Sequence, residues 1–141
     1  MIITISYLGV LVAAVASFAF GALWHSGLGF GAYWQKLMGF TREDMHKMPL
    51  TPVQAMLLGF IATVLFSYVL AHFIALAGIV VGGSSLGSAM EVGFWVWLGF
   101  VAVILANGLL WEGESLNLFL FNLAYQFLSI ELMAAIIGIM Q

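Results

Sequence analysis

The sequence predicts an all-α membrane protein, a four-transmembrane-helix bundle with a short interfacial helix between helices 1 and 2. Three observations carry this prediction. Of the 141 residues, 65% are hydrophobic and only 6% are charged, whereas soluble domains carry about 25% charged residues. Four apolar segments reach the length of about 20 residues that a helix needs to cross a bilayer. All three basic residues lie in one connection, between the first two of these segments.

The four predicted spans cover about residues 5–24, 52–80, 90–111 and 116–140 of a single membrane domain, 1–141. Residues 1–7 lack the positive start of a secretory signal, so the first segment is predicted to be a retained span. Small residues share one helical face in three spans, which lets helix backbones approach closely in lipid and predicts a compact bundle. They are Gly9, Ala13, Ser17 and Gly21, then Thr63, Ser67, Ala71 and Ala75, and finally Ala124, Ala135 and Gly138.

The boundaries of the elements carry recognisable signals. Thr41 followed by Asp44 is typical of a capping box and predicts a short surface helix over about 42–48. Thr51 with Gln54 predicts the start of the second span in the same way, with a proline at its first turn. After the third span, Gly113 is suited to end one helix and the serine two residues later to cap the next.

The basic residues also predict an orientation. Lys36, Arg42 and Lys47 all lie in the loop of residues 25–51. Loops rich in lysine and arginine stay in the cytoplasm. The loop is therefore predicted to be cytoplasmic, with the N-terminus and the C-terminus both outside.

Several chemistries are excluded. Without cysteine there is no disulfide, thiolate nucleophile or Cys-based metal site, and no basic patch suits nucleic acid. The sequence contains no serine elbow, phosphate-binding loop or HExxH motif, so we predict no catalytic residue and no cofactor. A metal site drawn from His25, His46, Glu112 and Glu114 matches no known ligand spacing, so no metal is predicted.

Ionisable residues inside spans need an explanation, because each costs roughly 2.5–3.5 kcal/mol on insertion scales. Glu131 lies well inside the last span between apolar neighbours, where desolvation favours the neutral acid. His72 and Glu91 fall in the same outer half of the bilayer, counting about 1.5 Å per residue. These three are candidate ion- or substrate-binding residues. The alternative is a buried Glu–His hydrogen bond that only fixes helix register, with Glu91 solvated at the interface.

The last span has a second polar face. Asn122, Gln126 and Ser129 are spaced by four and three residues and share one side of a helix, whereas Glu131 points roughly the other way. A helix that is polar on two sides cannot face lipid with either side. The last span is therefore predicted to lie at the centre of the bundle or at a contact between protomers.

A second polar group is predicted at the inner surface of the membrane. His25 continues the small-residue face of the first span and is expected to point into the bundle. Asn107 is placed to satisfy backbone groups at the turn after the third span. The inner-interface candidates are His25, Asn107, Glu112 and Asn122.

The end of the first span carries a family resemblance. Trp24 and Ser26 are followed by Phe30, Gly31 and Trp34. This order resembles the Trp-aromatic-Ser-Pro…Phe-Gly…Trp motif of a bacterial family of small four-span integral membrane proteins of unknown function. The resemblance covers nearly the whole chain. Similar residues in the other spans are Asn107, Trp111, Glu112 and Gly113, and then Leu118, Phe119, Asn122 and Tyr125.

Two residues depart from that family pattern. His25 stands in place of the usual Tyr or Phe, which weakens any family-wide aromatic role at this position. Gly27 stands in place of the usual Pro and is expected to loosen the turn. The resemblance implies four helices and a bacterial inner (cytoplasmic) membrane, and it implies no activity.

Three function classes remain open. We favour a homo-oligomeric transporter or channel for a small ion or solute, proton-coupled through Glu131, because ionisable residues in spans are functional by default. A homo-oligomer is expected because so small a fold has room for few cavities and its small-residue faces suit helices from another copy. The alternatives are a structural or accessory subunit of a larger membrane complex, and a membrane enzyme that acts on lipid headgroups through His25 and Glu112. Membrane lipids are partners in every case.

Overall fold

The computed structural model describes residues 3–141, apart from the side chain of Arg42, and residues 3–141 form helices and connections without a strand. Four helical runs are long and apolar enough to cross a membrane. Two short helices lie between the first and second runs. The elements are α1 (Tyr7–Trp24), α2 (Gly31–Met38), α3 (Arg42–His46), α4 (Pro52–Val81), α5 (Leu86–Val96), the π-helix η1 (Trp97–Ala102), α6 (Val103–Trp111) and α7 (Leu116–Met140). The predicted fold class is confirmed.

Helix α1 and the third run begin at different residues from those predicted, because serine caps set their first turns. The hydroxyl of Ser6 accepts a hydrogen bond from the backbone N–H of Gly9, so α1 begins at Tyr7 rather than near residue 5. Ser85 and Ser88 form a reciprocal capping box, so the third run begins at Leu86 rather than near residue 90.

The other predicted caps are present. Asp44 accepts a hydrogen bond from the backbone N–H of Thr41 at 2.9 Å, which completes the capping box of α3. Thr51 and Gln54 form the same kind of capping box at the start of α4, where the side chain of each accepts a hydrogen bond from the backbone N–H of the other. Gly113 has a φ of +73°, in the left-handed region that favours glycine, and follows the end of α6. Ser115 accepts the hydrogen bond that begins α7.

The connection between α1 and α4 holds one helix more than predicted. Only the segment after Thr41 was expected to be helical, but Gly31–Met38 forms α2 as well. This helix ends at Met38, and the φ of 66° at the next residue, Gly39, breaks the α-helical path. Helix α3 is shorter than expected and ends at His46.

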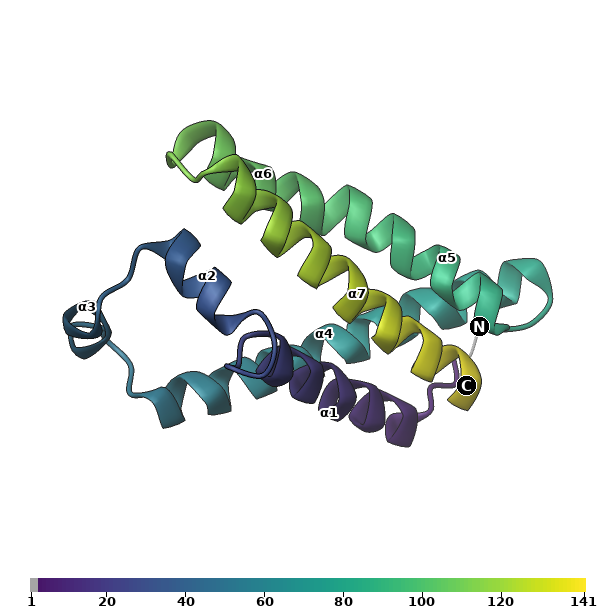
Figure 1. Ribbon diagram of the computed structural model, residues 1–141. Helices are drawn as coiled ribbons and strands as arrows, with labels where there is room; N and C mark the ends of the chain where they lie inside the picture. Colours follow the sequence, from purple (N-terminus) through teal and green to yellow (C-terminus); the bar gives the residue numbers. More distant parts are fainter. Residues whose placement is uncertain (1–2) are drawn as a thin grey trace.

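Helix α7 is the central element. Figure 1 shows it running diagonally between α1 and the α5–α6 run, and it packs against every other helix except α3. The prediction that the last span is central is therefore confirmed. The largest fully buried apolar side chains come from α4 and α7: Leu70, Ile74, Ile130 and Ile137.

The small-residue faces pack within the chain. Gly9, Ala13, Ser17 and Gly21 of α1 are all buried. On α5 and α7, a Cβ atom added to Gly138 would lie 2.5 Å from the Cβ of Ala89, so these two helices approach closely. Ala124 is an exception, because it is exposed and faces away from the other helices. The faces therefore explain the compact bundle and do not by themselves require a second copy.

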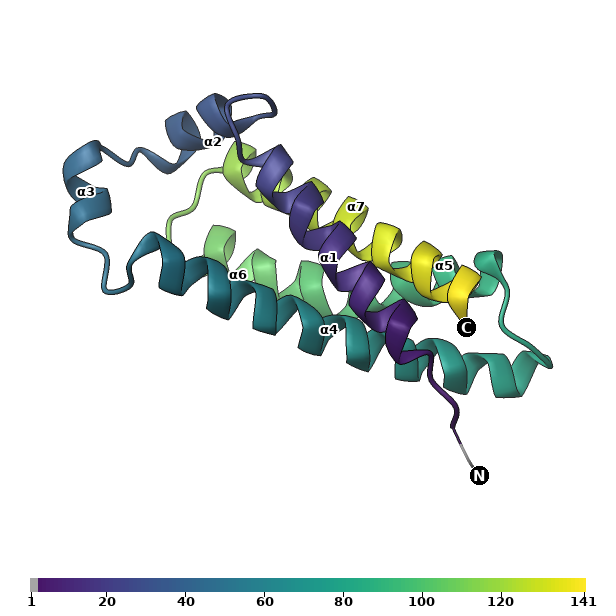
Figure 2. The same ribbon diagram turned by 90° about the horizontal axis from the view of Figure 1, so that it is seen from below.

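The two ends of the bundle differ. The α4–α5 turn, the start of α1 and the end of α7 lie together at one end (Figure 1). Helices α2 and α3 and the α6–α7 turn lie at the other end, as Figure 2 also shows. At that end the first seven residues of α4 are all exposed, and α6 has no buried residue. The buried residues of α4 all lie from Ser67 onward, so the helices pack more closely in the half of the bundle nearer the α4–α5 turn.

Candidate functional site: a polar cavity within the bundle

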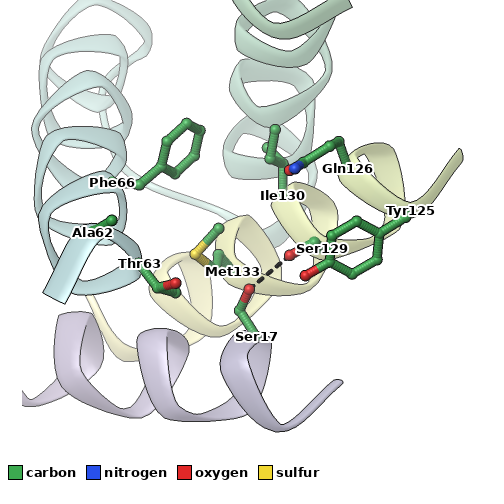
Figure 3. A pocket seen from close by; sticks show the side chains of 9 residues that line it. All are labelled: Ser17, Ala62, Thr63, Phe66, Tyr125, Gln126, Ser129, Ile130 and Met133. Carbon is green, nitrogen blue, oxygen red and sulfur yellow. Dashed lines mark hydrogen bonds between the residues drawn. The ribbon is translucent and has the colours of Figure 1, made fainter. Parts of the chain in front are cut away.

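A polar cavity of about 200 Å³ lies among α1, α4 and α7. Its polar side chains come from positions near the middle of each helix, so they lie near the middle of the membrane-crossing length. Figure 3 shows them converging on one space. We call this space the central cavity. Its lining residues are Ser17, Ala62, Thr63, Phe66, Tyr125, Gln126, Ser129, Ile130 and Met133.

One edge of the central cavity is a hydrogen bond between two helices. The hydroxyl oxygens of Ser17 and Ser129 lie 2.6 Å apart, and both side chains are buried. The hydroxyl of Tyr125 lies beside this pair (Figure 3). Thr63 on α4 donates its own hydrogen bond to the backbone oxygen of Gly59 at 2.8 Å. The Ser17–Ser129 bond and the bond from Thr63 to Gly59 thus hold three of these hydroxyl groups in place around the space.

The lining of the central cavity is polar but uncharged. Hydroxyl groups both donate and accept hydrogen bonds, and the Gln126 amide adds two donors and one acceptor. The volume has room for several water molecules or for one small solute. The arrangement can bind a small molecule through hydrogen bonds, and it offers no opposite charge to an ion.

A second cavity of about 570 Å³ adjoins the first and shares Thr63 and Tyr125 with it. We call it the elbow cavity, because it is bounded by His25 and Trp34, from the turn between α1 and α2. Its other lining residues are largely apolar. They are Phe18, Gly21, Ala22, Ala55, Met56 and Gly59. The two cavities together reach from the middle of the bundle to the end where α2 and α3 lie.

His25 holds a defined position beside the elbow cavity. Its Nδ1 atom lies 2.9 Å from the backbone oxygen of Gly21. Because a carbonyl oxygen only accepts, Nδ1 carries the proton and Nε2 is the acceptor of the neutral ring. The ring meets Tyr125 and Trp34 edge to face, with centroids 4.7 Å and 5.3 Å apart. The expectation that His25 points into the bundle agrees with this packing.

The turn that follows α1, which we call the elbow, is formed by close backbone contacts. The backbone N–H of Phe30 donates to the oxygen of Trp24 at 2.8 Å, and that of Gly31 donates to the oxygen of Ser26 at 2.9 Å. A Cβ atom on Gly31 would collide with the backbone oxygens of His25 and Ser26. Glycine is required here because the chain passes so close to itself.

The five residues of the predicted motif lie in or beside this elbow, from Trp24 at the end of α1 to Trp34 in α2. The Trp24 ring packs against Phe30 with centroids 4.5 Å apart, and against Phe121 of α7 at 5.6 Å. Ser26 donates from its hydroxyl to the backbone oxygen of Leu23 at 2.7 Å. Trp34 is the edge-to-face partner of His25. These residues thus form a turn anchored on α7, which also forms one wall of the elbow cavity.

Glu131 lies outside both cavities. It is only 9% exposed, and neither carboxyl oxygen has a hydrogen-bond partner among the described residues. A Cβ atom added to Gly93 of α5 would lie 3.3 Å from its Oε1 atom. The side chain therefore faces α5, on the opposite side of α7 from Ser129.

The structure does not bring His72 or Glu91 into a hydrogen bond with Glu131. The Nδ1 atom of His72 lies 2.8 Å from the backbone oxygen of Tyr68, one turn earlier on the same helix. Glu91 is exposed on α5. The three residues were grouped because they lie at a similar predicted depth in the membrane. In the structure their side chains lie on different faces of their helices and do not meet.

The inner-interface candidates divide into two sets. Asn122 donates to the Oε1 atom of Glu114 at 3.0 Å, which ties the α6–α7 turn to α7. Asn107 and Glu112 are exposed. In the described part of the chain, no three His, Asp or Glu side chains gather closely enough to hold a metal ion. The structure thus packs His25 against α7, ties Asn122 of α7 to the α6–α7 turn, and leaves Asn107 and Glu112 at the surface.

Sequence reasoning did not identify the central cavity as a site. Gln126 and Ser129 were recognised as one polar face, and Ser17 and Thr63 as members of small-residue faces. Their convergence depends on how three helices are rotated about their axes. The available signal was that hydroxyl residues sit at mid-span in three different spans, together with the amide of Gln126.

Comparison with known proteins identifies a family. The family described as "Protein of unknown function (DUF1761)" matches residues 8–138, and the chain belongs to it. No curated protein and no solved structure matches the chain. The resemblance to a family of unknown function is confirmed, and the family brings no assigned activity with it.

Proposed function

We propose that this member of the DUF1761 family is a membrane transporter or channel for a small, uncharged polar solute, with the central cavity as its binding site. The observation that carries the proposal is the cavity of about 200 Å³ lined by polar side chains from three helices at mid-span. Polar groups inside a membrane are costly and, where they face a cavity, usually mark a solute pathway. The elbow cavity provides the approach from the α2–α3 end.

The chemistry of the lining supports a neutral solute rather than an ion. Ser17, Thr63, Tyr125, Gln126 and Ser129 offer donors and acceptors but no charge. Desolvating an ion there would lack the compensation that an opposite charge provides. A small molecule with both hydrogen-bond donors and acceptors, such as urea or glycerol, fits this set.

Flux across vesicles tests the proposal. The purified protein is reconstituted into liposomes, and shrinking and reswelling are followed by stopped-flow light scattering with urea, glycerol or a non-permeant sugar outside. We expect faster solute uptake than in empty vesicles. Replacement of one polar group by an isostere, Thr63→Val or Gln126→Leu, removes about 1 kcal/mol of hydrogen bonding, which corresponds to a roughly fivefold lower flux.

A control variant separates the cavity from general damage. Val69 lies on α4, is exposed and lines neither cavity, so Val69→Leu is expected to leave the flux unchanged. Reconstituted wild-type protein that transports none of the solutes faster than empty vesicles would contradict the proposal. So would unchanged flux in both cavity variants.

We also propose that the protein works as a homo-oligomer in a bacterial inner membrane, with the loop of residues 25–51, which holds α2 and α3, in the cytoplasm and both termini outside. The exposed start of α4 and the exposed α6 leave apolar surface for a neighbouring helix. Lys36 and Lys47 in the loop support the orientation. Native mass spectrometry from mild detergent tests the assembly, and accessibility of a cysteine introduced at Met45 tests the side.

The same exposed surface favours a second candidate, an accessory subunit of a larger membrane complex. In that case a different protein would cover α4 and α6, and it would co-purify in fixed proportion at native expression. An enzyme acting on lipid headgroups receives no support from the geometry. Glu112 is exposed, whereas His25 is half-buried and its hydrogen bond goes to Gly21.

A further inference from the structure

We propose that Glu131 is a reversible proton-binding site inside the membrane, held as the neutral acid between α5 and α7. The inference rests on the proposed function only where it concerns coupling of the proton to solute flux. The site itself is argued from the packing around the carboxyl group.

The first argument is the space that the structure leaves for this carboxyl group. Glu131 follows Ile130, which is fully buried, and points at α5 where that helix has a glycine. A Cβ atom at Gly93 would lie 3.3 Å from Oε1 and 2.9 Å from the Cβ of Ala134. Any larger residue at position 93 would crowd both. The absence of a side chain on Gly93 thus accommodates the acid at a tight helix contact.

The second argument is the lack of a partner for a negative charge. Both carboxyl oxygens are buried without a hydrogen-bond donor among the described residues. No span contains Lys or Arg. An uncompensated carboxylate in such a place is far more costly than the neutral acid. The carboxyl group therefore keeps its proton while α5 and α7 are packed together.

The titratable groups on the neighbouring elements do not change this conclusion. Helix α5 contributes only Glu91, which is exposed. Helix α4 contributes His72, engaged with Tyr68 at 2.8 Å, and the Tyr68 ring stacks on Tyr7 of α1. Tyr125 of α7 lies on the cavity side. None of these groups forms a hydrogen bond with Glu131.

The third argument is an irregular helical segment that follows α5 next to the site. One turn after Gly93, the helix becomes the π-helix η1 (Trp97–Ala102). Such segments are rare, and they are frequently found at functional sites. The Trp97 indole N–H donates to the backbone oxygen of Leu123 at 3.1 Å, which attaches this segment to α7. Separation of α5 from α7 would admit water to Glu131 and allow the proton to leave.

Infrared spectroscopy tests the protonation directly. In reconstituted protein, a protonated carboxyl group in an apolar place gives a C=O stretching band that a carboxylate lacks. We expect such a band at neutral pH, its loss in Glu131→Gln, and its persistence in Glu91→Gln. The band should disappear at high pH and return when the pH is lowered again. A neutral-pH spectrum that is identical in wild-type protein and Glu131→Gln would overturn the proposal.

Chemical labelling gives a second readout. Dicyclohexylcarbodiimide partitions into the bilayer. The O–H of a protonated carboxyl group adds across one of its C=N bonds to give an O-acylisourea, and an O-to-N acyl shift then leaves a stable N-acylurea. Mass spectrometry should find this adduct on Glu131 at neutral pH, with less labelling as the pH rises. Labelling confined to the exposed Glu91 or Glu112 would count against the site.

Coupling to flux is measured apart from protonation. A pH gradient is imposed across the vesicles during urea or glycerol uptake, in wild-type protein and in Glu131→Gln. A gradient-dependent flux that is lost in the variant extends the proton site to the transport cycle. Absence of any solute flux would remove the proposed function, while the infrared band and the adduct would still decide whether Glu131 binds a proton.

Discussion

The buried hydrogen bond between Ser17 and Ser129 gives a quantitative prediction about how α1 and α7 are held together. The perturbations are Ser17→Ala, Ser129→Ala and the double variant. The two hydroxyl oxygens are 2.6 Å apart, and the side chains are 2% and 4% exposed. Removing one serine leaves the other hydroxyl buried and without its partner.

The magnitude follows from that burial. Leaving a buried group unsatisfied costs about 1–3 kcal/mol in soluble proteins, whereas polar contacts between membrane helices average about 0.6 kcal/mol and reach about 1.7. The bond is short, so we expect each single variant to lose about 1 kcal/mol of unfolding free energy. The double variant should lose about as much as one single variant, because no orphaned hydroxyl remains. The coupling energy is then about 1 kcal/mol.

The assay is reversible unfolding in mixed detergent micelles, followed by the fluorescence of the tryptophans. Because the hydroxyl of Tyr125 lies beside the pair (Figure 3), the cycle is repeated in a Tyr125→Phe background, which removes a substitute partner. The bond would be refuted as a stabilising contact if the losses of unfolding free energy simply add in both backgrounds. In that case the coupling energy lies within about 0.3–0.5 kcal/mol of zero.

Two further predictions concern the connection between α1 and α4. Gly31→Ala should cost roughly 1–3 kcal/mol of unfolding free energy, because its Cβ overpacks against the backbone oxygens of His25 and Ser26. The control Gly27→Ala has open space around it and should change the unfolding free energy by less than about 0.5 kcal/mol. Equal losses in the two variants would refute the inferred close contact at Gly31. Hydrogen bonds from the backbone and side chain of Thr41 lower the pKa of Asp44 in the folded protein. The stability that the Asp44 carboxylate adds to α3 is therefore fully present above about pH 4, the ordinary range for the pKa of Asp. It is lost as the pH falls through the lowered pKa of the folded state. An NMR titration should show the lowered pKa and a partial return toward the ordinary value in Thr41→Val, which keeps the backbone bond and removes the side-chain bond. An Asp44 pKa that does not move in that variant would disprove the contribution of the Thr41 side chain.

In the proposed function, the central cavity binds the solute and Glu131 binds the proton, on two opposite sides of one helix. The face with Tyr125 and Ser129 is polar and uncharged, and it borders a space large enough for a solute. The opposite side presents a single carboxyl group to a glycine on α5. If the helix contact at Gly93 opens during transport, protonation and solute binding are linked through the same rigid element, without a direct contact between them.

The sequence by itself determined the four long helices and several of the caps at their ends. Long apolar runs with almost no charge require helices in lipid, because each unsatisfied backbone group would otherwise be very costly. Caps are local, so Thr41 and Thr51 were predictable from residues three positions apart. The central position of the last span was also predictable, since a helix with polar groups on two sides must be covered on both.

Only the tertiary structure decided which polar groups meet. Depth in the membrane follows from counting residues along a span, and on that basis Glu131, His72 and Glu91 looked like one site. The rotation of each helix about its axis depends on side-chain packing between distant segments, which no local pattern encodes. That rotation brings Ser17 to Ser129 and leaves the Glu131 carboxyl group facing Gly93, so the candidate site lies on the other side of α7 from the residue that the sequence made most conspicuous.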